Sequence, residues 1–255
     1  MDNVSFNLCV QFAAQKISIN AEFPVLKNQF HGYLIDDPGE MYVNINPEDI
    51  AFERNQAIRE DTLAGISPRA LTEEYFVFIA LQRKITEEFF SRNILLFHGS
   101  VVAVDNSAYL FTAKSGTGKS THTRLWREQF GDRAVMVNDD KPFLQLTDDG
   151  VIAHGSPWNG KHRLGSNISV PLKAICILER SAENWIKPIS PAQALPMLFQ
   201  QSQRPQNPAN MPKYMELIDR LANSVEFYRM GCNMDPEAAR ISYEAMSRER
   251  KDERE

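Results

Sequence analysis

Apolar and polar positions alternate along the first part of the chain. Residues 4–12 carry an apolar side chain at every even-numbered position, and a period of two is typical of a strand with one buried face. Shorter runs at 16–20 and 41–46 repeat the alternation, and residues 36–39 between them have the composition of a turn. The first fifty residues therefore predict a small antiparallel β-sheet.

The pattern changes after the predicted sheet. Residues 55–69 are mostly polar and include Gly65 and Pro68, so a connector is expected there. From Thr72 to Phe89 the apolar residues recur at helical spacing along one face, which predicts a helix whose stripe belongs to the core. We therefore expect a small β-rich N-terminal region at 1–66 and a larger domain at 67–255.

Two apolar runs, at 97–104 and 107–112, flank Asp105 and Asn106. A two-residue turn of this composition between strands predicts a β-hairpin. If these two residues form the turn, the numbers of paired residues sum to about 211, and His98 faces about position 113. A histidine at a strand end can also be purely structural, and the register alone leaves both roles open.

The stretch Ala113-Lys114-Ser115-Gly116-Thr117-Gly118-Lys119-Ser120 fits the phosphate-loop pattern when alanine is allowed at its first position. An apolar run precedes it and a segment with helical spacing follows, so backbone N–H groups and a helix N-terminus would point at a polyphosphate. The residues predicted to bind the nucleotide are Ser115, Gly116, Thr117, Gly118, Lys119, Ser120 and Thr121. Lys119 is expected at the β- and γ-phosphates, and the Ser120 hydroxyl on Mg²⁺.

A second short apolar strand, at 134–137, ends in Asn138, Asp139 and Asp140. A strand that carries carboxylates at its C-terminal end after a phosphate loop can place an aspartate where Mg²⁺ and the attacking group meet. Strands also end in Asp-containing turns for structural reasons. We predict Asp139 and Asp140 as catalytic residues, with Ser120 and Asp140 as the metal ligands.

The loop at 154–163 is rich in hydrogen-bond donors. Lys161, His162 and Arg163 are candidates for contacts to the acceptor or to the transferred phosphoryl group, and a solvated basic turn is the alternative. Beyond a strand at 174–178, helices are predicted at 191–201, at 212–225 and from 235 to about 248. The polar segment 202–210 between the first two is either a lid or a connector.

Composition narrows the classes of partner. The chain has 255 residues, a formal net charge of −5 and only three cysteines, which are far apart in the sequence. An acidic chain argues against a nucleic-acid-binding surface, and these cysteines suggest neither a disulfide framework nor a zinc site. The chain has no continuous apolar run of about 18 residues and no signal-peptide pattern, so we expect a cytoplasmic protein without a membrane partner.

The order of His98-Gly99, hairpin, phosphate loop and Asp139-Asp140 resembles the catalytic domain of HPr kinase/phosphorylase, whose fold is related to phosphoenolpyruvate carboxykinase. The matching stretch runs from about Phe97 to Leu178, and the likeness is to the shorter stand-alone HPr-kinase-related proteins. The family's Arg-Gly-x-Gly segment has no match in this sequence. The resemblance implies an α/β fold (a mixed α+β sheet) with a P-loop kinase core, a small N-terminal antiparallel β region and C-terminal helices.

The resemblance also implies roles for the residues. Lys119 and the loop amides hold a nucleoside triphosphate, ATP or GTP, and Ser120 binds Mg²⁺. His98 lies near the reacting phosphate. One of Asp139 and Asp140 removes the proton of the acceptor hydroxyl and the other holds the metal; we favour Asp139 as the base. HPr kinases form hexamers, although nothing in this sequence requires a homo-oligomer.

The predicted function is an ATP- and Mg²⁺-dependent phosphotransferase that acts on an alcohol. The acceptor is a hydroxyl of a small molecule or of a serine in a peptide or protein. Two alternatives are a nucleotide-binding regulatory NTPase without an alcohol acceptor and a carboxykinase-like lyase. No N-K-x-D segment typical of a guanine-binding switch protein is found, and the chain is short for a carboxykinase.

Overall fold

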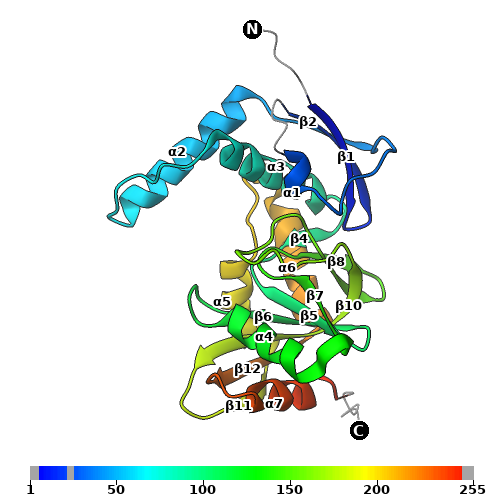
Figure 1. Cartoon of the computed structure of the whole chain (residues 1–255), viewed down its shortest axis with the longest axis vertical. Helices are drawn as coiled ribbons and strands as arrows, with labels where there is room; N and C mark the ends of the chain where they lie inside the picture. Colours follow the sequence, from blue (N-terminus) through cyan, green and yellow to red (C-terminus); the bar gives the residue numbers. More distant parts are fainter. Residues whose placement is uncertain (1–5, 22–25, 249–255) are drawn as a thin grey trace. The chain divides into compact units, whose positions relative to one another are not determined.

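The computed structural model describes residues 6–21 and 26–248, and the chain divides into two compact units, 1–89 and 90–255 (Figure 1). This division falls later in the sequence than the predicted limit between residues 66 and 67. The helix Glu73–Phe90 (α3) is the reason, because all but its last residue belongs to the N-terminal unit.

The N-terminal unit contains a three-stranded sheet in the order β1 (Phe6–Phe12), β2 (Gln15–Ala21) and β3 (Met41–Asn44). Strands β1 and β2 are antiparallel, whereas β2 and β3 are parallel. The prediction of a purely antiparallel sheet is therefore wrong. The segment between β2 and β3 includes the short helix α1 (Leu26–Gln29), and such a crossover returns the chain in the same direction. Val4, predicted in the first strand, lies outside the described residues.

A second helix, α2 (Pro47–Leu63), occupies most of the segment predicted as a connector, so that prediction is wrong. Among the side chains of α2 only Asp61 is buried, and a helix that packs so little needs no regular apolar stripe. Ion pairs attach it to α3: the Asp49 carboxylate lies 3.0 Å from Arg83 and 2.8 Å from Lys84. The helix therefore depends on polar contacts that hydrophobic periodicity does not report.

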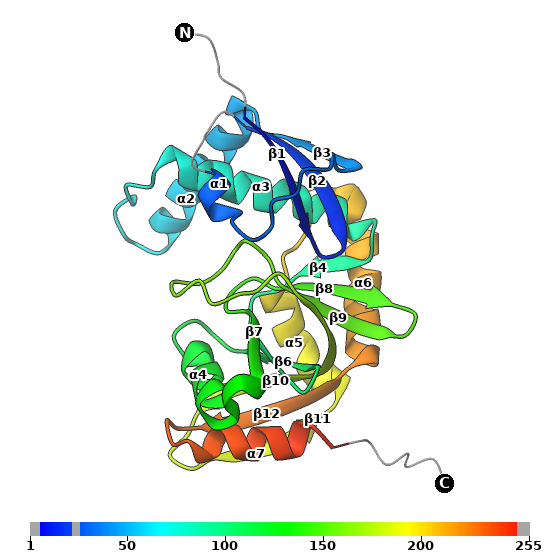
Figure 2. The same cartoon turned by 45° about the vertical axis from the view of Figure 1, so that its right-hand side comes forward.

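The C-terminal unit is built on a mixed sheet (Figure 2), in which nine strands are described between residues 90 and 248. They are β4 (Ile94–Leu96), β5 (Ser100–Val104), β6 (Ser107–Thr112), β7 (Ala134–Asn138), β8 (Phe143–Thr147), β9 (Gly150–His154), β10 (Ser169–Arg180), β11 (Trp185–Ile189) and β12 (Glu226–Cys232). Seven of them follow the order β4-β8-β9-β10-β6-β5-β7, and β12 pairs with both β10 and β11. The predicted mixed α/β class is confirmed.

Strand β10 organises this sheet because it pairs with three others. Its first residues are antiparallel to β9, and its second half runs parallel to β6 and to β12. Side chains of β10 alternate between two apolar clusters: Ile175 and Ile177 contribute to one, Ala174 and Cys176 to the other. Sequence patterns predicted only part of β10 and neither β11 nor β12. Polar residues in β11 and β12, and a proline in β11, obscure the alternation typical of a strand.

Helices cover both faces of this sheet. The helices α4 (Lys119–Phe130) and α7 (Glu237–Met246) contact each other and supply one cluster, with Trp126 at its centre. The helices α5 (Pro191–Gln201) and α6 (Met211–Ser224) contact each other and supply the other. All four agree with the helices predicted from the sequence. Three layers result, and the loops at the ends of β6 and β7 lie at one edge of the middle layer.

A buried polar group joins α4 to α7. His122 Nε2 lies 3.1 Å from Ser242 Oγ, and the Trp126 indole N–H donates to the same hydroxyl at 2.9 Å. Ser242 in turn donates to the Ala238 carbonyl at 2.8 Å. Burial lowers the pKa of His122 to about 3, since a charged imidazole has no compensating carboxylate there.

This histidine predicts an acid-sensitive fold. Between pH 6.5 and about 3, the unfolded chain binds a proton at position 122 that the folded chain does not, so the free energy of unfolding decreases as the pH falls. We expect His122→Gln to remove up to about 1.4 kcal/mol of this decrease per pH unit. Urea unfolding of both proteins at pH 7.5, 6 and 5 measures the difference. Parallel pH profiles would contradict the assignment.

Candidate functional site

The hairpin that precedes the glycine-rich loop has the predicted register. Val104 pairs with Ser107 and Ser100 with Phe111, so paired numbers sum to 211. Asp105 and Asn106 form the turn with φ of 50° and 63°, as two-residue hairpin turns require. Beyond the paired residues, the Thr112 hydroxyl donates to the His98 carbonyl at 3.0 Å. His98 is thus held at the end of β6, where the glycine-rich loop begins.

Residue 99 must be a glycine for the two strands to approach in this way. A Cβ there would lie 2.9 Å from the Leu110 side chain and 3.2 Å from the Phe111 carbonyl oxygen. The Gly99 N–H donates to the Asp140 carbonyl at 3.0 Å, which links the end of β7 to the start of β5. Close approach at Gly99 therefore brings His98 and Asp140 to the same place.

The loop between β6 and α4 has backbone conformations that suit its glycines. Gly116 and Gly118 have φ of 74° and 127°, in the region that side chains disfavour. Within the loop, the Thr117 N–H and hydroxyl both donate to the Lys114 carbonyl, at 3.2 and 2.8 Å. Arg180, at the end of β10, donates to the Gly116 carbonyl at 2.6 Å. The loop is therefore supported both from within and by the neighbouring strand.

Lys119, the first residue of α4, folds back over the loop. Its ammonium donates to the Ala113 carbonyl at 3.4 Å. Burial lowers its pKa, and the charge of Asp140 opposes that shift. Ser120 follows on the exposed side of the first helical turn, whereas Thr123 lies 3.1 Å from the Ser100 hydroxyl and anchors α4 to β5. Lysine charge and serine hydroxyl therefore flank the N-terminus of α4.

Strand β7 ends in a turn built around Asn138, which is fully buried. The Asn138 side-chain oxygen accepts from the N–H groups of Asp140 and Lys141, at 2.8 and 2.6 Å. This turn sends the two neighbouring carboxylates in different directions. The Asp139 carboxylate is buried and accepts from the Gly160 N–H at 2.7 Å. The Asp140 carboxylate instead lies 3.2 Å from His98 Nε2.

The charge of Asp140 is stabilised by its surroundings. Burial alone would raise its pKa, but the hydrogen bond to His98 and the charges of Lys141 and Lys119 lower it below its ordinary value. A carboxylate held ionised beside a lysine and a histidine is a common arrangement in active sites. The structure thus brings together His98, Lys119 and Asp140 of the predicted residues, and it places the Asp139 carboxylate in a different hydrogen bond.

The donor-rich loop is attached to this region through Asp139. Lys161, His162 and Arg163 are exposed, and their side chains make no hydrogen bond or ion pair within the described part of the chain. Arg163 has a φ of 47° and closes a tight turn through a 3.0 Å bond from its N–H to the Gly160 carbonyl. Their contact with a substrate stays a prediction.

A pocket of about 440 Å³ adjoins the glycine-rich loop on the side of β10 and β12. Gly116, Gly118 and Thr121 form one wall of it. The remainder of the lining includes residues that sequence patterns did not single out, namely Arg180, Ser181, Cys232, Asn233 and Met234. No motif marks these residues, because the loop that follows β12 reaches the site only through its pairing with β10.

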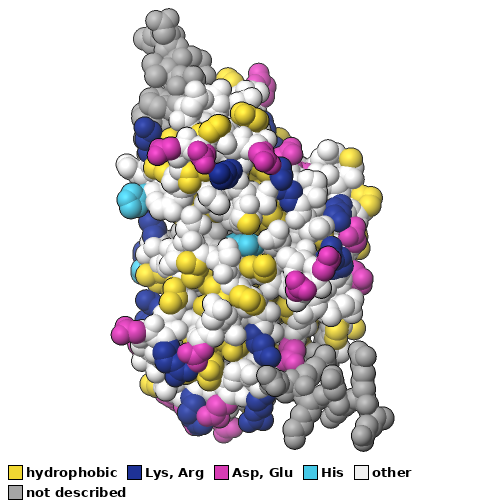
Figure 3. All heavy atoms as spheres, turned by 90° about the vertical axis from the view of Figure 1, so that its right-hand side faces the viewer, with side chains coloured by type: hydrophobic (Ala, Val, Ile, Leu, Met, Phe, Trp, Pro, Cys, Tyr) yellow, Lys and Arg dark blue, Asp and Glu magenta, His cyan; other side chains and the backbone are white. Residues whose placement is uncertain are grey.

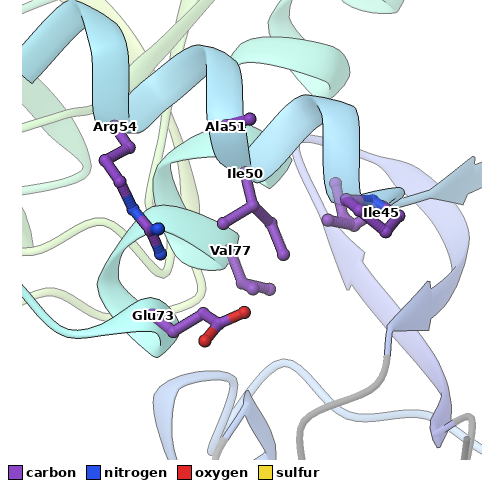
Figure 4. A pocket seen from close by; sticks show the side chains of 7 residues that line it. Ile45, Ile50, Ala51, Arg54, Glu73 and Val77 are labelled. Carbon is purple, nitrogen blue, oxygen red and sulfur yellow. The ribbon is translucent and has the colours of Figure 1, made fainter.

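A different pocket, of about 250 Å³, lies within the N-terminal unit (Figure 4). It is lined by Ile45 and by side chains of α2 and α3, and Arg54 and Glu73 extend into the space between these helices. Apart from these two charges its wall is mostly apolar. None of the residues predicted for phosphate chemistry belongs to it.

Three further observations concern metal binding, membrane spans and surface charge in the described residues. No group of three His, Cys, Asp or Glu side chains in residues 6–21 and 26–248 is arranged to hold a metal ion. None of the helices in this part of the chain has the length and hydrophobicity to cross a membrane. On the face drawn in Figure 3, basic and acidic side chains are interspersed.

The hydrogen bond from Arg180 to the Gly116 carbonyl predicts a measurable role for this arginine in nucleotide binding. We expect Arg180→Ala to raise the Kd for a nucleoside triphosphate about 3- to 10-fold, because one hydrogen bond to the Gly116 carbonyl is lost. Arg133→Ala is the matched control, since that exposed arginine pairs with Asp105 at the hairpin turn. Calorimetric titration of both variants gives the two constants, and equal values would contradict a role for Arg180.

Comparisons with known proteins give a likeness to solved structures and none at the level of sequence families. The sequence matches no protein-family model and no curated protein. Among solved structures, the HPr(Ser) kinase/phosphatase from Coxiella burnetii superposes on 59% of this chain and 95% of its own, with 10% sequence identity and a TM-score of 0.36. Values this low do not assign the chain to a family.

Proposed function

We propose that this chain is a nucleotide- and Mg²⁺-dependent kinase that transfers the γ-phosphoryl group of ATP to a hydroxyl group. One observation carries the proposal: Lys119 and the His98–Asp140 pair meet where a glycine-rich loop opens a helix. A loop of this kind binds phosphates through backbone N–H groups. The added lysine and ionised carboxylate are the groups that phosphoryl transfer needs.

The nucleotide is expected to extend from the glycine-rich loop into the adjoining pocket. Residues 115–121 would hold the phosphates, with Lys119 at the β- and γ-phosphates. The pocket of about 440 Å³ is large enough for a nucleoside. Apolar contact from Met234 and Cys232 suits a base, and Arg180, Ser181 and Asn233 offer polar groups at its edge. These features support ATP or GTP without choosing between them.

Ser120, which is exposed at the first turn of α4, is the residue that would hold a magnesium ion in this proposal. Asp140, predicted from the sequence as the second ligand, is assigned to proton transfer instead, because its carboxylate contacts His98. Mg²⁺ typically takes one or two protein ligands and completes its shell with phosphate oxygens and water. Bound there, Mg²⁺ would neutralise charge on the phosphate oxygens.

The chain's own groups then account for the transfer step. Lys119 neutralises phosphate charge, and its partial burial strengthens that interaction. The His98–Asp140 pair accepts the proton that the acceptor hydroxyl loses. Asp139 holds the donor-rich loop through the Gly160 N–H. The assignment of Asp139 as the base, favoured from the sequence, therefore passes to Asp140 in this proposal.

Transfer of labelled γ-phosphate from ATP to a panel of alcohols and serine peptides tests the proposal. We expect Mg²⁺-dependent labelling of at least one acceptor by the intact chain. Tight nucleotide binding with hydrolysis to water alone would contradict it and favour a regulatory NTPase. Nucleotide-dependent release of CO₂ from oxaloacetate would instead favour a carboxykinase-like lyase.

A further inference from the structure

A second polar pocket lies next to the His98–Asp140 pair, apart from the nucleotide pocket. It has a volume of about 200 Å³ and is lined by His98, Lys141 and residues 200–203, with Leu96 and Phe97. Three glutamines and one lysine are an unusual share of polar groups for so small a pocket. Neither the phosphate loop nor the donor-rich loop contributes to it.

Backbone pairing between residues 96–98 and 201–203 fixes the wall of this pocket. Phe97 and Ser202 form an isolated antiparallel bridge. The His98 N–H donates to the Gln201 carbonyl at 2.7 Å, and the Gln203 N–H donates to the Leu96 carbonyl at 2.9 Å. Side chains alternate in such pairing, so His98, Gln201 and Gln203 belong to the same side. Of the two roles predicted for segment 202–210, this pairing favours a fixed connector over a lid.

Two polar side-chain groups in this wall make no hydrogen bond within the described part of the chain. Gln201 is 7% exposed, yet its side-chain oxygen accepts no hydrogen bond. Lys141 is partly buried, and its ammonium makes no ion pair or hydrogen bond within residues 6–21 and 26–248. Buried polar groups without partners are costly in a folded protein, and they are tolerated where a ligand supplies the missing bonds. A ligand here must donate to Gln201 and accept from Lys141.

The pocket is continuous with the proposed transfer site. His98 lines it and contacts Asp140. Lys141 also lines it, and its charge contributes to the lowered pKa of Lys119. Its volume is below the roughly 300–1,000 Å³ of pockets for drug-sized ligands. One hydroxyl of the acceptor is used by the reaction itself. Further hydroxyl groups on the same small molecule can both donate to Gln201 and accept from Lys141, and they fit a pocket of this volume more easily than a peptide backbone does.

We propose that this pocket binds the phosphoryl acceptor, and that the acceptor is a small polyhydroxylated molecule of about monosaccharide size; this rests on the proposed kinase function. One hydroxyl oxygen bonds to the γ-phosphorus as the bond from that phosphorus to the β–γ bridging oxygen breaks. The proton passes to the His98–Asp140 pair, and the nucleoside diphosphate leaves. The other hydroxyls bond to Gln201, Gln203 and Lys141.

The test compares acceptors and a glutamine variant in the full-length chain. Transfer from labelled ATP is measured to glycerol, erythritol, ribose, glucose, gluconate and a serine peptide, and nucleotide binding is measured separately by calorimetry. In Gln201→Met we expect the KM for the best polyol to rise about 10-fold, with the Kd for ATP unchanged. Gln129→Met, an exposed glutamine near the end of α4, is the control and should change neither value.

The urea midpoint of unfolding distinguishes a role of Gln201 in binding from a purely structural role. Replacing a buried amide that lacks a partner by an apolar group should keep or raise the urea midpoint of Gln201→Met. A lower midpoint with an unchanged KM would overturn the inference. Transfer to the serine peptide and to no polyol would overturn it while leaving the kinase proposal intact. Absence of nucleotide binding in the intact chain would instead contradict the proposed function itself.

Discussion

Lys119→Ala is expected to lower the rate of phosphoryl transfer by about 10²- to 10³-fold, as the loss of a preorganised charge at the transferred group does in other enzymes. The lysine is placed for this role by the first turn of α4 and by its 3.4 Å bond to the Ala113 carbonyl. Its charge is partly buried and near Asp140, so water would replace it poorly. We also expect the Kd for ATP to rise about 10-fold or more.

The same loop provides a matched control for this variant. Lys114 is exposed, and the loop uses its carbonyl oxygen, which accepts from Thr117 and is retained in Lys114→Ala. That variant should bind ATP and transfer phosphate within about 3-fold of the parent chain, since an exposed charge contributes little. Single-turnover transfer and calorimetric titration on both variants give the comparison. Similar losses in the two would show that general positive charge, and no specific lysine, is responsible.

The central elements of the site were predictable because local patterns determine them. The two-residue turn at Asp105-Asn106 sets the hairpin register, and that register places His98 at the end of β6. The glycine positions and helix spacing likewise locate the loop and α4. These features depend on residues within about thirty positions of one another, and such short-range rules are the ones that a single sequence contains.

The parts of the site and of the fold that were not predicted depend on contacts between segments that are distant in the sequence. Met234 reaches the glycine-rich loop only because β12 pairs with β10, and Gln201 reaches His98 only because Ser202 pairs with Phe97. Helix α2 was missed for a related reason: ion pairs to α3 hold it, and its exposed apolar residues show no period. Propensity and periodicity do not report either kind of contact.

The two neighbouring aspartates show most clearly what could not be predicted from the sequence alone. From the sequence, Asp139 and Asp140 are equivalent carboxylates at a strand end. Asn138 separates them, because its side-chain oxygen accepts from the N–H groups of residues 140 and 141 and so forms a tight turn. One carboxylate then holds the Gly160 N–H and the other contacts His98. The roles of the pair therefore depend on a side-chain hydrogen bond of a third residue.

Asp140→Asn should therefore lower phosphoryl transfer by about 10²- to 10⁴-fold, the contribution expected of a general base, without a comparable loss of stability. Its side chain is 35% exposed and an amide of the same shape can still contact His98. Because the pKa of Asp140 lies below its ordinary value of 3.8, the parent carboxylate is still charged at pH 5. The ratio of the two rates should then be similar at pH 5 and pH 8.

Asp139→Asn is the matched comparison, and it should show the opposite pattern. The Asp139 carboxylate is 7% exposed and accepts from the Gly160 N–H at 2.7 Å. An amide oxygen makes a weaker bond there, so we expect a loss of about 1–2 kcal/mol in the free energy of unfolding. Transfer should fall less than about 10-fold, because the donor-rich loop is placed less firmly. Urea unfolding and single-turnover rates measured on both variants decide the assignment. If transfer falls more in Asp139→Asn than in Asp140→Asn, then Asp139 is the base and the hydrogen bond to Gly160 must open during the reaction.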